Sequence, residues 1–436
     1  MSVAADSPVT QRSLGLPELI AMGVGGMIGG GIFSVLGMAV EIAGPAAPLA
    51  FVVGALVALA AGYSYVKLAL AFHSDGASFT YLEHAFPAWP HVAGIAGWTV
   101  IVGYVGTLAL YAYTFGAYAA HLLGDPSNAL LRMALSACVL LVFMAVNLVG
   151  ARVTGRAEDI IVYTKIILLT IFAVAGVTTV QPERVVAMGS GSITSVLVAG
   201  AVLFVAFEGF QLITNSVTET REPERSVPRG IYGSIVITSV IYLGVAVVAV
   251  GSLGTSGLMA ANEYALAVAA EPALGRAGTI LIDIAALLAT SSAINATAFG
   301  ASRMLAEMAQ QGRVPRAFTF RSRARVPWVA IVVLTGGALA FAMTSSLEII
   351  ATFSSLTFLL VSIGVSLANL RLRRETASSP YVVVAGLGLM GAATVLLLVH
   401  LYERSPSELA FTVGIFAAVA VLELAFAWLH KRKDDA

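Results

Sequence analysis

The chain has 436 residues, of which 58% are hydrophobic and 11% are charged, and its 24 Lys and Arg residues balance its 24 Asp and Glu residues. A soluble chain of this length would form about three domains, but this composition is typical of a protein whose solvent is lipid. The zero net charge gives no indication of nucleic-acid binding. The single cysteine, Cys138, excludes an intrachain disulfide and is expected to be a buried, inert thiol.

Residues 1–13 are polar and lack the apolar core and cleavage site of a signal peptide, so the first apolar segment is expected to stay in the mature protein. Twelve apolar windows of about 20 residues follow, each long enough to span a bilayer. They lie at 14–42, 46–72, 91–123, 129–150, 157–180, 193–219, 229–254, 275–311, 327–344, 347–372, 380–402 and 407–430. The windows at 91–123 and 275–311 are too long for a perpendicular span and must tilt or project into water.

The Lys and Arg residues predict the orientation of these spans. With a cytoplasmic N-terminus, nineteen of the 24 fall on the cytoplasmic side, four fall outside, and Lys165 lies within a span. Since positive residues favour the cytoplasmic side, we expect a multi-pass protein of the cell membrane with both termini in the cytoplasm. If the number of spans were wrong by one or by three, later loops would change sides and the positive residues would no longer separate. The observed separation therefore supports the count of twelve as well.

A run of glycines lies in the middle of the first window. Five of the seven residues from Gly25 to Gly31 are glycine, and each glycine inside a helix costs about 1 kcal/mol relative to alanine. We therefore expect the first span to break there. In a bilayer, a broken helix is tolerated only where its backbone groups face protein, water or a ligand, and such a break near the midplane is typical of a transporter binding site.

A second interruption is expected in the sixth span, where Glu208 and Gly209 lie at mid-depth. The first span begins near 14 and breaks near 29, and the sixth begins near 193 and breaks near 208. These matching offsets, five spans apart, indicate inverted five-helix repeats. The predicted fold class is a single all-α transporter domain with twelve transmembrane helices. A five-plus-five inverted repeat (about 14–180 and 193–372) has discontinuous helices 1 and 6, and two extra C-terminal helices follow at about 380–430.

The chain resembles the amino acid–polyamine–organocation superfamily, whose members share a five-plus-five fold of the LeuT type. Four stretches in order carry the resemblance, namely the glycine run ending at 29–33, the aromatic segment 204–210, the charged loop 219–229 and the segment 302–315. With the twelve spans, the resemblance covers almost the whole chain. One departure concerns an acid that members often carry after the Gly-aromatic pair of span 6. This chain has Gln211 there, and its acid, Glu208, precedes the glycine.

The resemblance implies an amino-acid substrate, and the expected breaks would suit one. Unwinding exposes N–H groups at a helix start, which carries roughly +0.5 of a charge and suits a carboxylate. Carbonyl groups freed by the breaks suit the ammonium group. The residues expected at the substrate, by backbone or side chain, are Met27, Gly29, Gly30, Gly31, Tyr104, Phe204, Val205, Phe207, Glu208 and Gly209.

Several of these side chains have two interpretations. Phe204 and Phe207 would either gate the occupied site or serve as ordinary span packing, and Tyr104 would either line the pocket or only pack. Gly209 would either mark a break or allow close helix packing. A charged Glu208 at this depth costs several kcal/mol unless it is paired or protonated, so it would bind a cation, relay a proton or remain neutral in a helix contact.

Lys165 lies within span 5, and an intramembrane lysine is by default a functional hypothesis. In sodium-coupled relatives of this fold a cation bridges spans 1 and 8. Some proton-coupled members of the family have a span 5 lysine whose ammonium group can take that place. Ser291 and Ser292 of span 8 could hydrogen-bond to such a lysine, so Lys165, Ser291 and Ser292 form the predicted proton-coupling site. The alternative is that Lys165 extends to the cytoplasmic interface.

Other charged residues have less specific interpretations. Asp283 is an intramembrane acid whose partner the sequence does not identify. Arg303 and Glu307 are spaced for an i, i+4 pair on one helix face. The loop 219–229 would either latch the inward face shut through ion pairs or form a solvated face.

We expect a secondary active amino-acid transporter, a proton-coupled symporter that imports its substrate by alternating access, and not an enzyme. No cofactor or metal is expected, since the proton is the coupling ion and six scattered histidines show no metal-ligand spacing. No G-x-x-x-x-G-K-[ST] motif supports ATP-driven transport. The rivals are an amino-acid or amine exchanger without proton coupling and a potassium transporter of the wider superfamily. The expected partners are a small amino acid and the lipid bilayer, with the oligomeric state left open.

Overall fold

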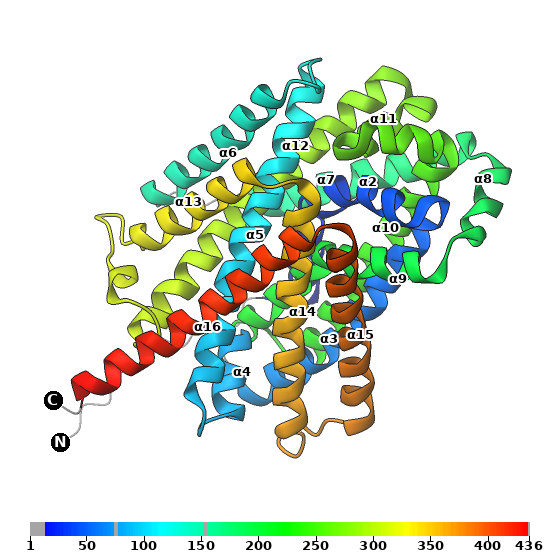
Figure 1. The fold of residues 1–436 in the computed structure, drawn as a ribbon. Coiled ribbons are helices and arrows are strands. Elements are labelled where there is room, and N and C mark those ends of the chain that lie inside the picture. Colours follow the sequence, from blue (N-terminus) through cyan, green and yellow to red (C-terminus); the bar gives the residue numbers. More distant parts are fainter. Residues whose placement is uncertain (1–13, 74–76, 151–154, 435–436) are drawn as a thin grey trace.

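The computed structural model describes residues 14–73, 77–150 and 155–434, and this part of the chain is predominantly helical (Figure 1). The α-helices are α1 (Leu16–Met27), α2 (Gly31–Ala43), α3 (Ala47–Phe72), α4 (Ala77–Ala85), α5 (Pro90–Leu122), α6 (Ala129–Val149), α7 (Gly155–Gly176), α8 (Pro182–Ala187), α9 (Ile193–Val202), α10 (Pro223–Ala261), α11 (Ala265–Ala269), α12 (Glu271–Gln310), α13 (Trp328–Thr344), α14 (Leu347–Arg371), α15 (Pro380–Arg404) and α16 (Pro406–Asp434). The 3-10 helices are η1 (Gly44–Ala46), η2 (Val177–Thr179), η3 (Met188–Ser190), η4 (Leu203–Ser216), η5 (Asn262–Tyr264) and η6 (Arg316–Thr319).

Ten helical stretches in the described part of the chain are long and apolar enough to cross a bilayer. Two further apolar helices, α1 and α13, are shorter. The windows expected to exceed a perpendicular span form α5 and α12, which have 33 and 40 residues. The backbone of α12 is not helical at Gly275, where the element is kinked. At 1.5 Å per residue, α5 and the part of α12 after Gly275 are each about 50 Å long, which exceeds the roughly 30 Å of hydrocarbon in a bilayer.

The helices pack mainly within two groups. In the first, α10 packs against α1 and α3, and η4 packs against α1 and α3. In the second, α5 packs against α6, α12, α13 and α14. Figure 1 shows α5, in cyan, crossing most of the height of the molecule. The first group contains both irregular helices, and α14 of the second group packs against η4.

The predicted interruption of the first span is present. Helix α1 ends at Met27, α2 begins at Gly31, and the residues between them are not helical. The first hydrogen bond of α2 runs from the Ser34 N–H to the Gly30 carbonyl at 2.9 Å. The N–H groups of Gly31 to Phe33 therefore have no acceptor within the helix, as at any helix start.

The sixth span differs from the expected break near 208. The chain stays helical, but at Leu203 the α-helix α9 passes into η4, a 3-10 helix of 14 residues. Runs of this length are uncommon, since 3-10 hydrogen bonds have poorer geometry. Ser355 of α14 holds the transition: its hydroxyl donates to the Val202 carbonyl at 2.5 Å and accepts from the Val205 N–H at 2.9 Å.

The two irregular helices touch backbone to backbone. A Cβ atom on Gly209 of η4 would lie 2.2 Å from the carbonyl carbon of Gly26 and 2.3 Å from the nitrogen of Met27. A Cβ atom on Gly26 would in turn lie 3.1 Å from the Cα of Gly209. Glycine is therefore required here to let α1 approach η4.

A second link joins the same elements at their ends. The Leu14 N–H donates to the Glu219 carbonyl at 3.1 Å, and the Arg221 N–H donates to the Leu14 carbonyl at 2.8 Å. These bonds form an isolated parallel bridge between Leu14 and Thr220. The residues that lead into α1 are thus tied by main-chain bonds to those that follow η4.

The prediction of a buried Cys138 was wrong. Cys138 is exposed on α6, a helix that packs against α5, α12 and α13. Because these neighbours cover only part of α6, its remaining apolar residues face outward. In a membrane protein that surface meets lipid, which accepts a small apolar thiol as readily as a protein core does.

Gly209→Ala is expected to destabilise the protein, because the added methyl group would overlap the backbone of Gly26 and Met27. Overpacking typically costs about 1–3 kcal/mol, so the thermal midpoint in detergent should fall. Gly388→Ala on α15 is the matched control, since a Cβ atom there meets nothing within 4 Å. Equal midpoints for the two variants would contradict the backbone contact.

Ser355→Ala is expected to loosen the start of η4, because it leaves the buried Val205 N–H without its acceptor. Hydrogen–deuterium exchange should accelerate in the peptide around Val205, since an unsatisfied buried group costs about 1–3 kcal/mol. Ser354→Ala is the neighbouring control, since the Ser354 hydroxyl donates to Ile350 of its own helix at 2.7 Å. Unchanged exchange around Val205 in the Ser355 variant would argue against this role.

Candidate functional site

The glycine run faces an aromatic side chain of α5. A Cβ atom on Gly30 would lie 2.5 Å from Cδ1 of Tyr111, and one on Gly29 would lie 3.2 Å from the Tyr111 hydroxyl oxygen. On its other side, Gly31 lies against Ala206 of η4, whose Cα would be 2.9 Å from an added Cβ. The structure thus brings the glycine run, α5 and η4 together, with no room for side chains at the glycines.

Tyr242 of α10 joins the two irregular helices. Its buried hydroxyl donates to the Met27 carbonyl at 2.6 Å and lies 3.2 Å from the Ala206 carbonyl oxygen. The Met27 carbonyl, expected at the substrate ammonium, therefore already accepts one hydrogen bond, and a carbonyl oxygen can accept a second. Neither Tyr242 nor Tyr111 is among the residues expected at the substrate from the sequence. For Tyr111, the available signal was its position two turns from Tyr104 on the same face of α5.

Phe204 and Phe207 are both fully buried. The ring of Phe207 packs edge-on against Tyr242 at 5.4 Å. A Cβ atom on Gly54 of α3 would lie 3.0 Å from the Phe207 ring. Phe207 thus lies on the side of η4 that faces α3 and α10.

A cavity of about 340 Å³ lies between α5, η4 and α12. Its lining residues are Ser78, Val100, Tyr104, Gln211, Asn215, Thr297, Phe299, Gly300, Ala301, Arg303, Met304 and Glu307. Arg303 and Glu307 are exposed, whereas Gln211 is buried and Tyr104 half-buried. The cavity therefore runs inward from the end of the bundle that contains α4, and Tyr104 is the predicted substrate residue that lines it.

Arg303, at the mouth of this cavity, lies over the ring of Phe299, with its guanidinium carbon 3.8 Å from the ring centroid. This is a cation–π contact one turn away on the same helix. At the start of α10, Arg225 forms an exposed ion pair at 3.7 Å with Glu222, the residue that precedes this helix. A pair as exposed as this contributes little to stability.

The carboxylate of Glu208 is buried, with 7% of the residue exposed. One of its oxygens accepts from the Gln211 side-chain amide at 2.7 Å, and the other lies 3.4 Å from the Thr107 hydroxyl. Thr107 is one turn along α5 from Tyr104, which lines the cavity, so the carboxylate lies one turn from the cavity wall. Glu208 points toward α5, whereas Gly209, next to it, packs against α1.

The amine of Lys165 is directed into the protein. Lys165 is 1% exposed, and its ammonium group donates to the Gly25 carbonyl near the end of α1 at 3.2 Å. Gly25 fits closely here, since an added Cβ would lie 2.6 Å from Val162 of α7. Span 5 thus contacts the irregular first span through the predicted lysine, and this contact opposes the interpretation that Lys165 extends to the interface.

Helix α12 packs against α7 and contributes the hydroxyl residues of the predicted coupling site. Ser291 and Ser292 are half-buried there. The neighbouring Thr290 hydroxyl donates to Ala286 of its own helix at 2.7 Å. Asn295 accepts from Asn147 of α6 at 3.1 Å.

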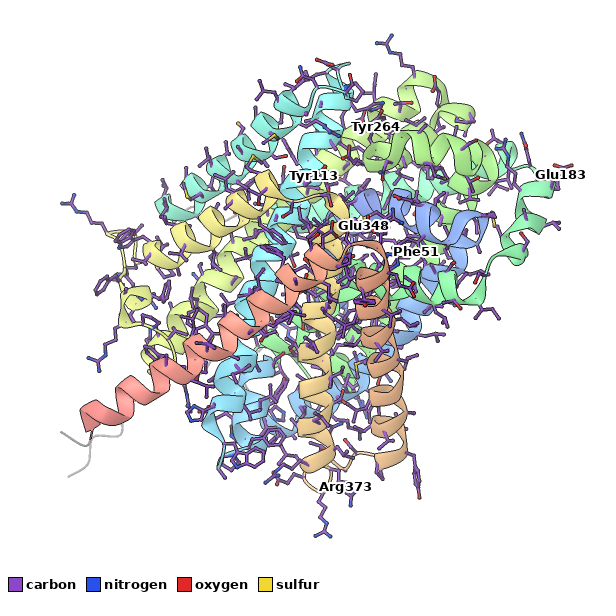
Figure 2. The ribbon with its side chains drawn as sticks, viewed as in Figure 1. Phe51, Tyr113, Glu183, Tyr264, Glu348 and Arg373 are labelled. Carbon is purple, nitrogen blue, oxygen red and sulfur yellow. The ribbon has the colours of Figure 1, made fainter. Side chains whose placement is uncertain are left out.

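A polar cluster closes the opposite end of the bundle. His121 of α5 lies 2.9 Å from Asp283 of α12 and stacks on Tyr264 of η5. Next to Tyr264, Glu263 accepts from Tyr113 at 2.7 Å and pairs with Arg132 of α6. Asp283 thus has the partner that the sequence did not identify. Figure 2 shows Tyr113 and Tyr264 in the upper part of the molecule and Arg373 at its lower end.

Comparison with known proteins places the chain in a family. The amino acid permease family profile matches residues 14–427. An uncharacterized protein of Methanocaldococcus jannaschii is 31% identical over 97% of both chains. The inner membrane transport protein YbaT of Escherichia coli is 28% identical over 97% of both chains. The branched-chain amino acid permease BcaP of Bacillus subtilis is 25% identical over 81% of this chain and 80% of its own. The chain therefore belongs to the amino acid permease family and is a multi-pass amino-acid transporter of the cell membrane, not an enzyme.

Proposed function

We propose that the protein is a proton-coupled symporter that imports amino acids by alternating access. The observation that carries this proposal is the buried ammonium group of Lys165 at the Gly25 carbonyl, 3.2 Å away. A protonated lysine there ties α7 to the end of α1 with a charge-assisted hydrogen bond. Loss of the proton weakens that bond, so proton binding and the position of α1 are linked. Ser291 and Ser292 provide hydroxyl groups on the neighbouring α12.

The proposed membrane layout has twelve spans and both termini in the cytoplasm. In it, α1 and α2 together form the first span, α9 and η4 form the sixth, and α13 forms the ninth. The excess of Lys and Arg on one side, nineteen against four, supports this orientation. The five-plus-five repeat with two extra C-terminal helices is part of the same proposal, supported by irregular backbone in both the first and the sixth span.

We propose that the substrate carboxylate binds the N–H groups at the start of α2, including that of Gly31. These groups have no acceptor in the helix and carry the positive end of its dipole. The α-ammonium group would bind carbonyl oxygens of Met27, Val205 and Glu208. Tyr242 holds the first of these carbonyls in place.

The cavity and the polar cluster correspond to two sides of an alternating-access cycle. The cavity opens at the α4 end, which is cytoplasmic in the proposed layout, and the Glu263 cluster closes the other end. The structure therefore fits an inward-facing state. To reach the outward-facing state, the group of α1, α2, α3, η4 and α10 would rock against α5, α6, α12, α13 and α14, and the contacts of Glu263 with Tyr113 and Arg132 would break.

Lys165→Ala is expected to abolish the dependence of uptake on a proton gradient. Purified protein in liposomes would be given a radiolabelled mixture of amino acids, with and without an inward gradient of about two pH units. Such a gradient supplies about 2.7 kcal/mol per proton, enough for about 100-fold accumulation by a one-proton symporter. Wild-type protein should concentrate at least one amino acid, and the variant should only equilibrate it.

Lys67→Ala is the control for this experiment, because the Lys67 ammonium group bonds the Ala377 carbonyl at the end of the bundle, at 3.1 Å. It should retain gradient-driven accumulation. Gradient-driven accumulation by Lys165→Ala would exclude the coupling role. Wild-type uptake that ignores the gradient but rises with amino acid inside the vesicles would instead identify an exchanger.

A further inference from the structure

We propose that Glu208 recognises a second positive charge on the substrate, so that the transporter selects amino acids whose side chain ends in an ammonium or guanidinium group. This inference rests on the proposed amino-acid transport and adds a substrate class to it. Three observations carry it: one buried carboxylate lies near the cavity, no cation of the described residues is paired with it, and its spacing from the start of α2 suits a distal charge.

Glu208 is separated from the cavity by Gln211, the buried lining residue next to it. Its carboxylate accepts a hydrogen bond from Gln211, whose side chain lines the cavity, at 2.7 Å. Its other oxygen lies against Thr107, one turn along α5 from Tyr104, which lines the cavity as well. A modest movement of the Gln211 side chain would therefore bring a bound ligand into contact with this carboxylate.

The hydrogen bonds of Glu208 come from two neutral groups. Among the described residues, no Lys, Arg or His side chain forms an ion pair with Glu208. Thr107 also bonds the Gly103 carbonyl at 3.1 Å, so its single hydrogen is shared. A buried carboxylate without a counter-ion is unfavourable by several kcal/mol. A cationic substrate would supply the missing charge, and the ring of Tyr104 would add a cation–π contact.

The spacing along α5 fits a distal cation better than the α-ammonium group. Tyr111 contacts the glycine run, and Thr107, four residues earlier, contacts Glu208. Four residues of α-helix correspond to about 6 Å. The α-ammonium nitrogen is two bonds from the carboxylate carbon, or about 2.5 Å, which is too short to reach both places. A lysine side chain places its ammonium group about 6 Å from Cα, which matches the separation.

The test compares two ligands that carry a distal charge with two uncharged analogues of lysine. Wild-type protein in liposomes would take up radiolabelled L-lysine, and in a parallel assay radiolabelled L-norleucine, each in competition with unlabelled lysine, ornithine, norleucine and Nε-acetyl-lysine. Norleucine has the lysine chain without its ammonium group, and the acetyl derivative keeps the nitrogen without its charge. We expect lysine and ornithine to compete at least about 10-fold better than the two uncharged analogues, the scale for a buried charge pair.

Glu208→Gln should then reduce the apparent affinity for lysine by at least about 10-fold, and leave that for norleucine within about twofold. The substitution keeps the backbone carbonyl, and Gln211 can turn its amide to satisfy the new one. Glu423→Gln is the control, because Glu423 is a buried acid on α16 that lies against Gly94. It should leave the lysine preference unchanged.

Three results would overturn the inference. They are a wild-type protein that carries norleucine but not lysine, equal competition by lysine and norleucine, and an equal loss of both ligands in Glu208→Gln. In each of these cases amino-acid transport is still observed, so the proposed amino-acid transport stands and only its substrate class changes. If wild-type protein moves no amino acid of either charge while its thermal unfolding is normal, the proposed function fails and this inference fails with it.

Discussion

The structure depends on one contact between two backbones. Gly209 of η4 lies so close to Gly26 and Met27 of α1 that even a methyl group would overlap the main chain. Because no side chain separates them, the polar groups of both irregular helices occupy one small volume in the middle of the protein. Tyr111, Tyr242 and the start of α2 then converge on this volume, which gives the transporter a dense group of backbone donors and acceptors at the expected depth of the bilayer centre.

Irregular backbone in a membrane protein must find hydrogen bonds within the protein. Here three side chains from three different helices supply them: Tyr242 of α10 at Met27 and Ala206, Ser355 of α14 at Val202 and Val205, and Lys165 of α7 at Gly25. Two of them are neutral and hold the geometry. The third is ionisable, and in the proposed mechanism its proton controls the position of α1. Hydrogen bonds from a side chain to the irregular backbone therefore serve both the stability of the fold and the proposed proton coupling.

The sequence predicted features that depend on local composition. The glycine run predicted the break between Met27 and Gly31, whereas the functional role that its depth in a span suggested for Lys165 stays a prediction. The partners could not be foreseen, because Tyr242 and Ser355 look like ordinary span residues until tertiary packing brings them to a break far away in the chain. The form of the sixth span was also missed: pinned by Ser355, the backbone tightens into a 3-10 helix instead of unwinding. The prediction that Cys138 is buried was wrong because an apolar residue of a membrane protein can face lipid instead of the protein core.

The bridge between Leu14 and Thr220 has a consequence for how the sequence can change. It consists of two main-chain hydrogen bonds, one on each side of Leu14. Every residue type except proline carries both groups, so mutations at either position can accumulate while the joint between the first and sixth spans persists. Because the bridge uses main-chain groups, the first and sixth spans can stay linked in relatives whose side chains at these two positions are different.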